Sequence, residues 1–190
     1  YEEFPYVFGS IAGGSALKFG IYRRKETGAW MTGHPTAQRT LELSDAIVIA
    51  RRNRDQLVAG ARLLDALPRD PSAVDYDALQ TQLRAAAPDV AENSWGHKYF
   101  SLCAPDLLDD YHATSYQNFH LLKLRVEPPD GRYRAAAIFA RIARQLDLLP
   151  TQLGATLNHI DGDPHRWIRM GTTEGDSGRS QWAAMRSGGY

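Results

Sequence analysis

The strongest constraint on the fold is a helical pattern that runs from Leu43 to Leu67. Apolar residues recur there at helical spacing, at Ile47, Ala50, Leu57, Ala61 and Leu64. Because an α-helix turns once every 3.6 residues, this spacing places the apolar side chains on one face, with arginines on the other. Pro68 and Pro71 follow, and proline cannot continue a helix. We therefore expect one long amphipathic helix, ended by these prolines.

Shorter helices are expected after it. Ser72 and Asp75 have the spacing of a capping box that opens a helix, which Pro88 closes. The next candidate is a buried helix near 95–103, with one apolar face formed by Trp95, Tyr99, Leu102 and Cys103. Thr114 and Gln117 repeat the cap pattern before residues 116–125. Further helices are predicted over 133–148 and 150–159.

The two ends of the chain have β character. The aromatic-rich runs at 6–8 and 17–22 flank a Gly/Ser turn, and the tail from His165 has the composition of a new β-containing unit. The fold expected is α+β and mainly helical, with a small N-terminal β-hairpin or sheet packed with a helical bundle, and a β-containing tail. The predicted units are 1–42, 43–160 and 161–190.

Composition excludes several classes of protein. The 22 Lys and Arg balance the 22 Asp and Glu, so overall charge indicates no nucleic-acid or membrane partner, and any such surface must be local. Cys103 is the only cysteine, which rules out an internal disulfide and favours a reducing, cytoplasmic location. No apolar run is long enough to cross a bilayer. Both ends look like cuts, so we expect a region of a longer protein.

Known catalytic patterns are incomplete. The glycines at 9–15 and Lys18 lack the spacing of a Walker loop, which favours a hairpin turn. Asp106, Asp109 and Asp110 could serve a metal-dependent nuclease or, with His112, a hydrolase, but a capping or solvated turn is the simpler interpretation. The histidines show no metal-ligand spacing, and His97 and His112 are predicted to be structural. We expect no catalytic residues, no metal and no cofactor.

Basic residues mixed with aromatic ones favour binding instead. Cations suit phosphate contact and aromatic rings suit base stacking. The first such group consists of Lys18, Tyr22, Arg23, Arg24, Lys25 and Trp30, and the second of Arg166, Trp167 and Arg169. The alternatives are an ordinary hairpin with a solvated basic end and, for Trp167, core packing. Arg51, Arg52, Arg54 and Arg62 give the long helix a basic side, which helices also carry for solubility alone.

Four segments resemble the amino-terminal region of McrB-like AAA+ proteins, relatives of modification-dependent restriction GTPases. They are Gly9-Ser-Ile-Ala-Gly-Gly-Ser-Ala-Leu-Lys-Phe-Gly-Ile-Tyr-Arg-Arg24, Trp95-Gly-His-Lys-Tyr-Phe-Ser-Leu102, Pro105-Asp-Leu-Leu-Asp-Asp-Tyr-His112 and Tyr116-Gln-Asn-Phe-His-Leu-Leu-Lys123. Residues 167–190 are similar to the opening of an EVE-like module, a fold that inspects modified bases.

The resemblance implies antiviral defence, with recognition domains in front, a nucleotide-driven motor behind and a separate nuclease subunit. The first hypothesis is therefore a region that recognises modified or foreign DNA. The rival is an interaction module in which helices 43–148 dock to the motor domain or to subunits of the parent complex, without DNA contact.

Overall fold

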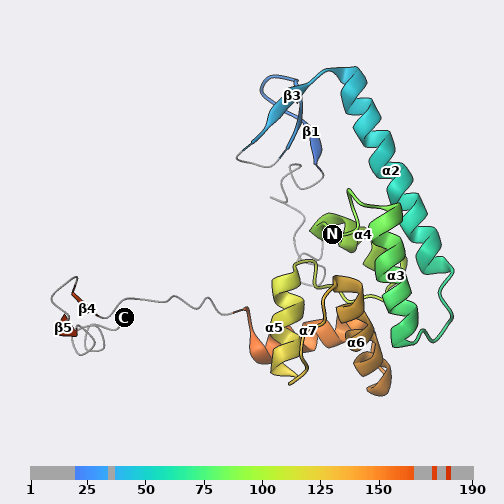
Figure 1. Cartoon of the computed structure of the whole chain (residues 1–190), viewed down its shortest axis with the longest axis vertical. Helices are drawn as coiled ribbons and strands as arrows, with labels where there is room; N and C mark the ends of the chain where they lie inside the picture. Colours follow the sequence, from blue (N-terminus) through green and yellow to red (C-terminus); the bar gives the residue numbers. More distant parts are fainter. Residues whose placement is uncertain (1–19, 34–36, 165–172, 175–178, 181–190) are drawn as a thin grey trace.

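The chain is mainly helical, with six described helices and a small three-stranded antiparallel sheet (Figure 1). The computed structural model describes residues 20–33, 37–164, 173–174 and 179–180. The sheet consists of β1 (Ile21–Arg23), β2 (Trp30–Thr32) and β3 (Arg39–Leu41). The helices are α2 (Leu43–Asp65), α3 (Ala73–Ala86), α4 (Ser94–Cys103), α5 (Thr114–Lys123), α6 (Arg132–Gln145) and α7 (Pro150–Asp161). The expected fold class, mainly helical α+β, is confirmed.

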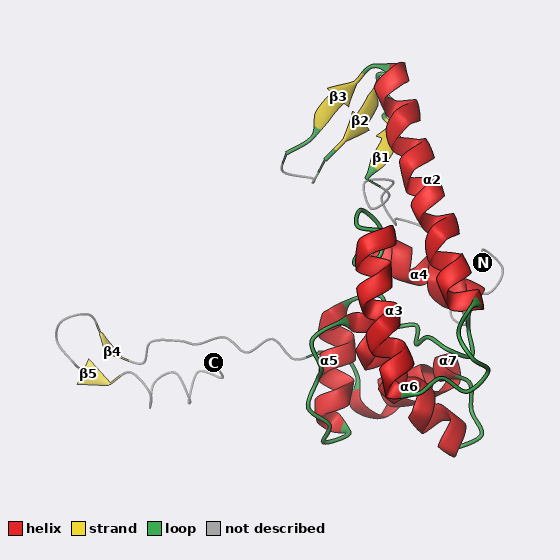
Figure 2. Ribbon diagram, turned by 45° about the vertical axis from the view of Figure 1, so that its right-hand side comes forward, coloured by secondary structure: helices red, strands yellow, loops and turns green. Residues whose placement is uncertain are grey.

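The sheet lies beside the N-terminal half of α2, away from the other helices (Figure 2). Its strands follow the order β1-β2-β3, and each strand contacts α2. Opposite Met31 stand Tyr22 on β1 and Thr40 on β3. Met31 is 7% exposed and Tyr22 is partly buried, so this face is the inner one at β1 and β2, whereas Thr40 on the edge strand β3 is exposed. On the other face Arg23 and Arg39 are exposed and Trp30 is partly exposed, and we refer to it as the open face.

The long helix ends close to its predicted position. α2 stops at Asp65, two residues before Leu67, and the chain then turns through Pro68 and Pro71. The capping box that opens α3 is confirmed, because the Ser72 hydroxyl accepts from the Asp75 amide and the Asp75 carboxylate accepts from the Ser72 amide. Local sequence therefore determines both of these helix boundaries.

The core of the bundle has two adjoining parts. The first packs α2, α3 and α4 against α6 around Tyr76, Leu83 and Phe100, which are fully buried. Gly60 of α2 permits this packing, since a Cβ there would lie 2.3 Å from the Phe100 ring. The second part joins α5, α6 and α7 around Leu121 and Phe139. Together they form the compact lower body of Figure 1.

The predicted face of α4 is wrong. Leu102 is 60% exposed and Tyr99 is 37% exposed, whereas the buried residues are Gly96, His97, Phe100 and Ser101. The reason is close backbone packing, because a Cβ on Gly96 would lie 1.9 Å from the Val90 carbonyl oxygen. That contact turns the glycine side of the helix inward.

The predicted cap of α5 is also wrong. Ala113 precedes the helix and makes no side-chain cap, and Gln117 is buried instead of reaching back to the helix start. The prediction for α6 extended to Leu148, but that helix ends at Gln145. A residue with positive φ, Asp147 at 56°, follows and turns the chain toward α7.

Two short strands in the tail, β4 (Thr173–Glu174) and β5 (Arg179–Ser180), pair antiparallel, in keeping with the expected β content. The predicted strand at 6–8 and the candidate site residues Lys18, Arg166, Trp167 and Arg169 lie outside the described residues. Among the described helices, none combines the length and apolarity needed to cross a bilayer.

Candidate functional site

The open face of the sheet brings two arginines beside one tryptophan. Arg23 is the direct cross-strand partner of Trp30, whose partner on the other side is Leu41. Arg39 lies two residues before Leu41 and therefore on the same face, diagonal to Trp30. Both arginines are exposed and the indole is partly exposed. Cationic side chains next to an aromatic one on the same face suit phosphate contact combined with base stacking.

The turn between β1 and β2 holds the other predicted cations. Arg23 donates from Nε to the Gly28 carbonyl at 2.9 Å, and Arg24 donates to the Gln38 side-chain oxygen at 2.7 Å. Gly28 has a φ of 68°, a conformation that glycine adopts at little cost. Lys25 is exposed and pairs with no carboxylate among the described residues. The turn thus fixes Arg23 and Arg24 while Lys25 stays free.

Tyr22 is not part of this face. It pairs with Met31 on the inner side, and its hydroxyl is buried without a hydrogen-bond partner among the described atoms. The structure therefore brings Arg23 and Trp30 together but separates Tyr22 from them. Sequence reasoning missed Arg39, although strand alternation around residues 39–41 could have placed it beside Trp30.

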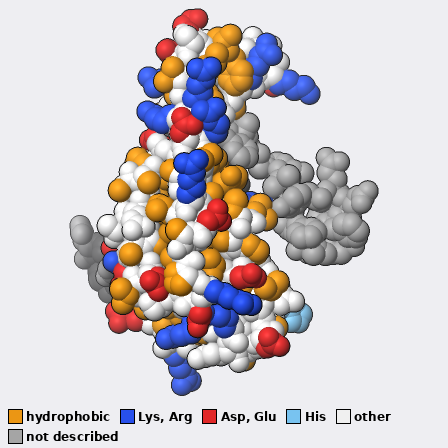
Figure 3. Space-filling model, turned by 90° about the vertical axis from the view of Figure 1, so that its right-hand side faces the viewer, with side chains coloured by type: hydrophobic (Ala, Val, Ile, Leu, Met, Phe, Trp, Pro, Cys, Tyr) orange, Lys and Arg blue, Asp and Glu red, His pale blue; other side chains and the backbone are white. Residues whose placement is uncertain are grey.

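Charge is distributed unevenly along the described chain. Residues 20–62 hold eight Lys or Arg and four Asp or Glu, whereas residues 63–164 hold nine and fourteen. Figure 3 shows many Lys and Arg side chains over the upper part of the molecule, where few Asp and Glu lie, whereas those near the lower end are interspersed with Asp and Glu. The local basic surface expected from the balanced composition is therefore at this end.

Some arginines on α2 are neutralised. Arg52 pairs with Asp89 at 2.9 Å, and Arg54 pairs with its neighbour Asp55 at 2.6 Å. Arg51 and Arg62 are exposed and have no carboxylate partner within the described part of the chain. The helix therefore presents a mixed surface.

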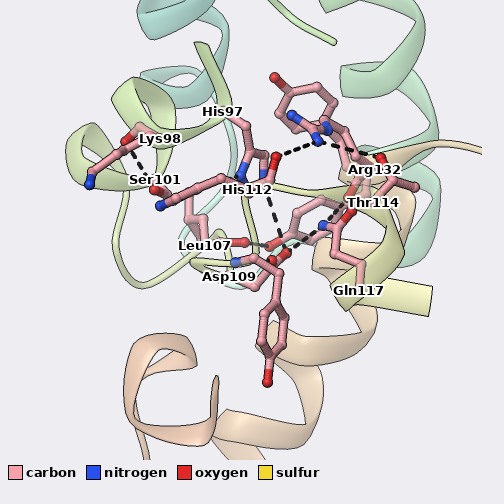
Figure 4. A network of polar contacts seen from close by, with 12 residues as sticks. His97, Lys98, Ser101, Leu107, Asp109, His112, Thr114, Gln117 and Arg132 are labelled. Atoms are coloured by element: carbon pink, nitrogen blue, oxygen red, sulfur yellow. Dashed lines mark hydrogen bonds and ion pairs between the residues drawn. The ribbon is translucent and has the colours of Figure 1, made fainter. Parts of the chain in front are cut away.

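A second candidate site is a buried polar cluster between α4, α5 and α6 (Figure 4). The Nδ1 atoms of His97 and His112 lie 3.3 Å apart, and His97 Nε2 is 4.0 Å from the Asp109 carboxylate. Asp109 accepts from the Tyr111 amide at 2.8 Å and from the Gln117 side chain at 2.9 Å. His97, Asp109 and Gln117 are all fully buried.

Arg132, 3% exposed, completes this cluster from the start of α6. Its guanidinium donates to the carbonyl oxygens of Asn93 and His112, each at 3.0 Å, and to the Thr114 hydroxyl at 3.4 Å. One side chain thereby links the segments that precede α4 and α5 to α6. Backbone carbonyls are its partners, which is typical of a structural tie.

Burial controls ionisation in the cluster. It holds the pKa of His97 well below its usual value, aided by the positive charge of Arg132 and by His112, and it lowers the pKa of His112 to about 4. It raises the pKa of Asp109 to about 7, against the hydrogen bonds from Gln117 and the Tyr111 amide. At neutral pH both imidazoles are therefore neutral, and the approach of His97 to Asp109 is not an ion pair.

The cluster corrects one sequence interpretation. Asp109 was expected in a cap or solvated turn, but it is fully buried, because Gln117 and the Tyr111 amide satisfy its carboxylate. Neighbouring Asp110 is partly buried, and burial raises its pKa to about 6. His97 and Asp109 are fully buried and His112 is partly buried, so this polar network contributes to the packing of α4 and α5 against α6.

The chain matches no family model, no curated protein and no solved structure. Within the described residues, no group of three or more His, Cys, Asp or Glu side chains could hold a metal ion. The open face of the sheet is therefore the candidate site that the geometry favours, and we name it the basic sheet face: Arg23, Trp30 and Arg39, with Lys25 at its edge.

Proposed function

We propose that this chain is a nucleic-acid recognition region that binds DNA through the basic sheet face. The observation that carries the proposal is the placement of Trp30 between Arg23 and Arg39 on the open side of the sheet. The guanidinium groups would contact phosphates, and the indole would stack on a base. Stacking of this kind contributes roughly 1–3 kcal/mol per base.

The uneven charge supports the same surface. The sheet and α2 carry the excess of cations, while the rest of the described chain carries an excess of carboxylates. A polyanion is therefore attracted to the sheet end and repelled by the lower bundle. This field orients the chain on DNA without requiring base-specific contacts.

The resemblance to McrB-like proteins supports a defence role for this binding. In this proposal the ligand is modified or foreign DNA, and the motor domain and the nuclease are other parts of the parent complex. In this proposal the chain itself binds and does not catalyse, and the contacts of His97 with His112 and of Asp109 with Gln117 belong to the packing of the bundle.

The test is a fluorescence-anisotropy titration of the whole chain with labelled single-stranded and duplex DNA. The variant Lys25→Gln/Arg39→Gln removes two cations that make no ion pair with the described residues. The matched control, Arg69→Gln/Arg141→Gln, removes two exposed cations from the lower bundle with the same change in net charge.

We expect the sheet variant to bind several-fold more weakly than the wild type and the control to bind as the wild type does. Equal loss in both variants would mean that net charge alone is sensed. Unchanged binding in the sheet variant would refute this surface. Duplexes with and without methylated cytosine then show whether the modification contributes to affinity.

A further inference from the structure

The solvent side of α2 carries a row of exposed residues that combines two valines with three charged side chains. Val48, Arg51, Asp55, Val58 and Arg62 follow one another at intervals of three, four, three and four residues, which places them on one stripe. Val48 is 63% exposed and Val58 is 40% exposed, and the three charged residues between and after them are exposed as well. We call this row the outer stripe.

The opposite side of the helix meets the body of the protein. Its buried residues are Ala46, Gln56, Gly60 and Leu64. Leu43 and Ile47, beside the outer stripe, are 56% and 42% exposed, so apolar surface extends past the stripe itself. The views in Figures 1 and 2 agree that α2 runs along the rim of the molecule, with no other described helix on its outer side.

The order of residues in the stripe is self-complementary. Val48 and Val58 each lie five residues from position 53. Arg51 and Asp55 each lie two residues from it. In an antiparallel pair of identical helices with a two-fold axis at that position, Val48 faces Val58 of the second copy and Arg51 faces Asp55 of the second copy. Each contact occurs twice, as two-fold symmetry requires.

We propose that the outer stripe is a homodimer interface in which α2 packs antiparallel against α2 of a second copy of this chain. A parallel pair in register would put Arg51 against Arg51 and Asp55 against Asp55, so like charges oppose that arrangement. Asp55 binds Arg54 through Oδ1 alone, which leaves Oδ2 for the incoming arginine.

The size of the helix suits this role. At 1.5 Å per residue, a helix as long as α2 extends about 35 Å. Specific interfaces bury roughly 1,200–2,000 Å² in total, so in this proposal the exposed Leu43 and Ile47 contribute to the contact alongside the stripe. Exposed ion pairs add little affinity, so the valines and their apolar neighbours supply the attraction while Arg51 and Asp55 set the register.

The inference does not rest on DNA binding. The stripe lies on α2, whereas the basic sheet face lies on the strands, so either surface can fail without the other. Variants of the stripe should therefore change the mass of the particle, and variants of the sheet should change DNA affinity.

The experiment is sedimentation velocity of the whole chain, from micromolar to millimolar concentration, with a reductant present because Cys103 is exposed. The wild type should show a concentration-dependent monomer–dimer equilibrium. Arg51→Glu and Asp55→Arg should each be monomeric, because each variant places like charges together at both symmetric contacts.

Two rescue experiments fix the register. The double variant Arg51→Glu/Asp55→Arg should dimerise again, since it restores both pairs with reversed polarity. An equimolar mixture of the two single variants should form a heterodimer although neither forms a homodimer. Circular dichroism should show the wild-type helix content throughout, because these side chains are exposed.

Four results would overturn the proposal. If the wild-type chain is monomeric at every concentration, the proposed homodimer interface does not exist. Charge variants that dimerise as the wild type does place the contact elsewhere. If neither single variant dimerises and their mixture does not dimerise either, the antiparallel register is wrong. The register is also wrong if the Val48→Asp variant dimerises as the wild type does.

Discussion

Replacing Arg132 by methionine should destabilise the fold, although the new side chain has similar length and full apolarity. The guanidinium of Arg132 donates a hydrogen bond to the His112 carbonyl and another to the Asn93 carbonyl, which also accepts from the His97 amide. A buried carbonyl that loses its donor costs about 1–3 kcal/mol, and a shared hydrogen bond contributes about 0.5–1.5 kcal/mol.

Together these two contributions give a loss of about 1.5–4.5 kcal/mol. Relief from burying a charge offsets part of it, since burial already lowers the pKa of Arg132. For a chain of this size, each kcal/mol lowers the melting temperature by about 2–4 °C. Urea unfolding followed by far-UV circular dichroism measures the free energy directly.

The matched control is Arg141→Met on the same helix, where the arginine is exposed and makes no ion pair with the described residues. It should change the free energy of unfolding by less than about 0.5 kcal/mol. Arg132→Lys should fall between the two, because one ammonium group cannot reach both carbonyls as the planar guanidinium does. If Arg132→Met and Arg141→Met are equally stable, the tie between α4, α5 and α6 does not hold the fold.

Three further outcomes are expected. Gly60→Ala should lower stability by about 1–3 kcal/mol in urea unfolding because its Cβ meets the Phe100 ring, and Phe100→Leu in the same chain should recover part of the loss. Ser72→Ala should cost about 1 kcal/mol by the same measurement, through loss of the α3 cap, and a variant as stable as the wild type would show that the cap is dispensable. The raised pKa of Asp109, about 7 against an unfolded value of 3.8, adds stability that is complete below about pH 4 and lost as pH rises through about 7. Urea unfolding at a series of pH values should therefore show the free energy of unfolding of Asp109→Asn rising relative to that of the wild type between these pH values. A difference in free energy that stays constant with pH would contradict the raised pKa of Asp109.

Helix boundaries could be predicted from the sequence where a proline or a capping residue determines them. The apolar period and Pro68 located α2, and Ser72 with Asp75 located the start of α3, because caps and proline act within a few residues. The mainly helical α+β class followed from the same signals.

Which side chains are buried could not be predicted where contacts between residues distant in the sequence determine it. Asp109 looks like a cap or solvated-turn residue, yet it is buried and accepts from the side chain of Gln117, eight residues further along the chain. The inward side of α4 was set by Gly96 against the Val90 carbonyl, a contact that periodicity cannot show.

The candidate site was predicted in part. The basic and aromatic composition of residues 22–30 singled out a segment whose Arg23 and Trp30 pair across two strands, but strand pairing was needed to add Arg39 and to separate Tyr22 from them. The predicted boundaries at 42 and 160 and the role of the second basic group in the tail stay predictions.

The most direct test of the account is the salt dependence of DNA binding by the whole chain. A plot of the logarithm of the association constant against the logarithm of salt concentration has a slope set by the number of phosphates neutralised. We expect a steep negative slope for the wild type, shallower by about two in Lys25→Gln/Arg39→Gln and unchanged in Arg69→Gln/Arg141→Gln. Affinity that does not change with salt, or equal slopes in both double variants, would contradict DNA recognition by the basic sheet face.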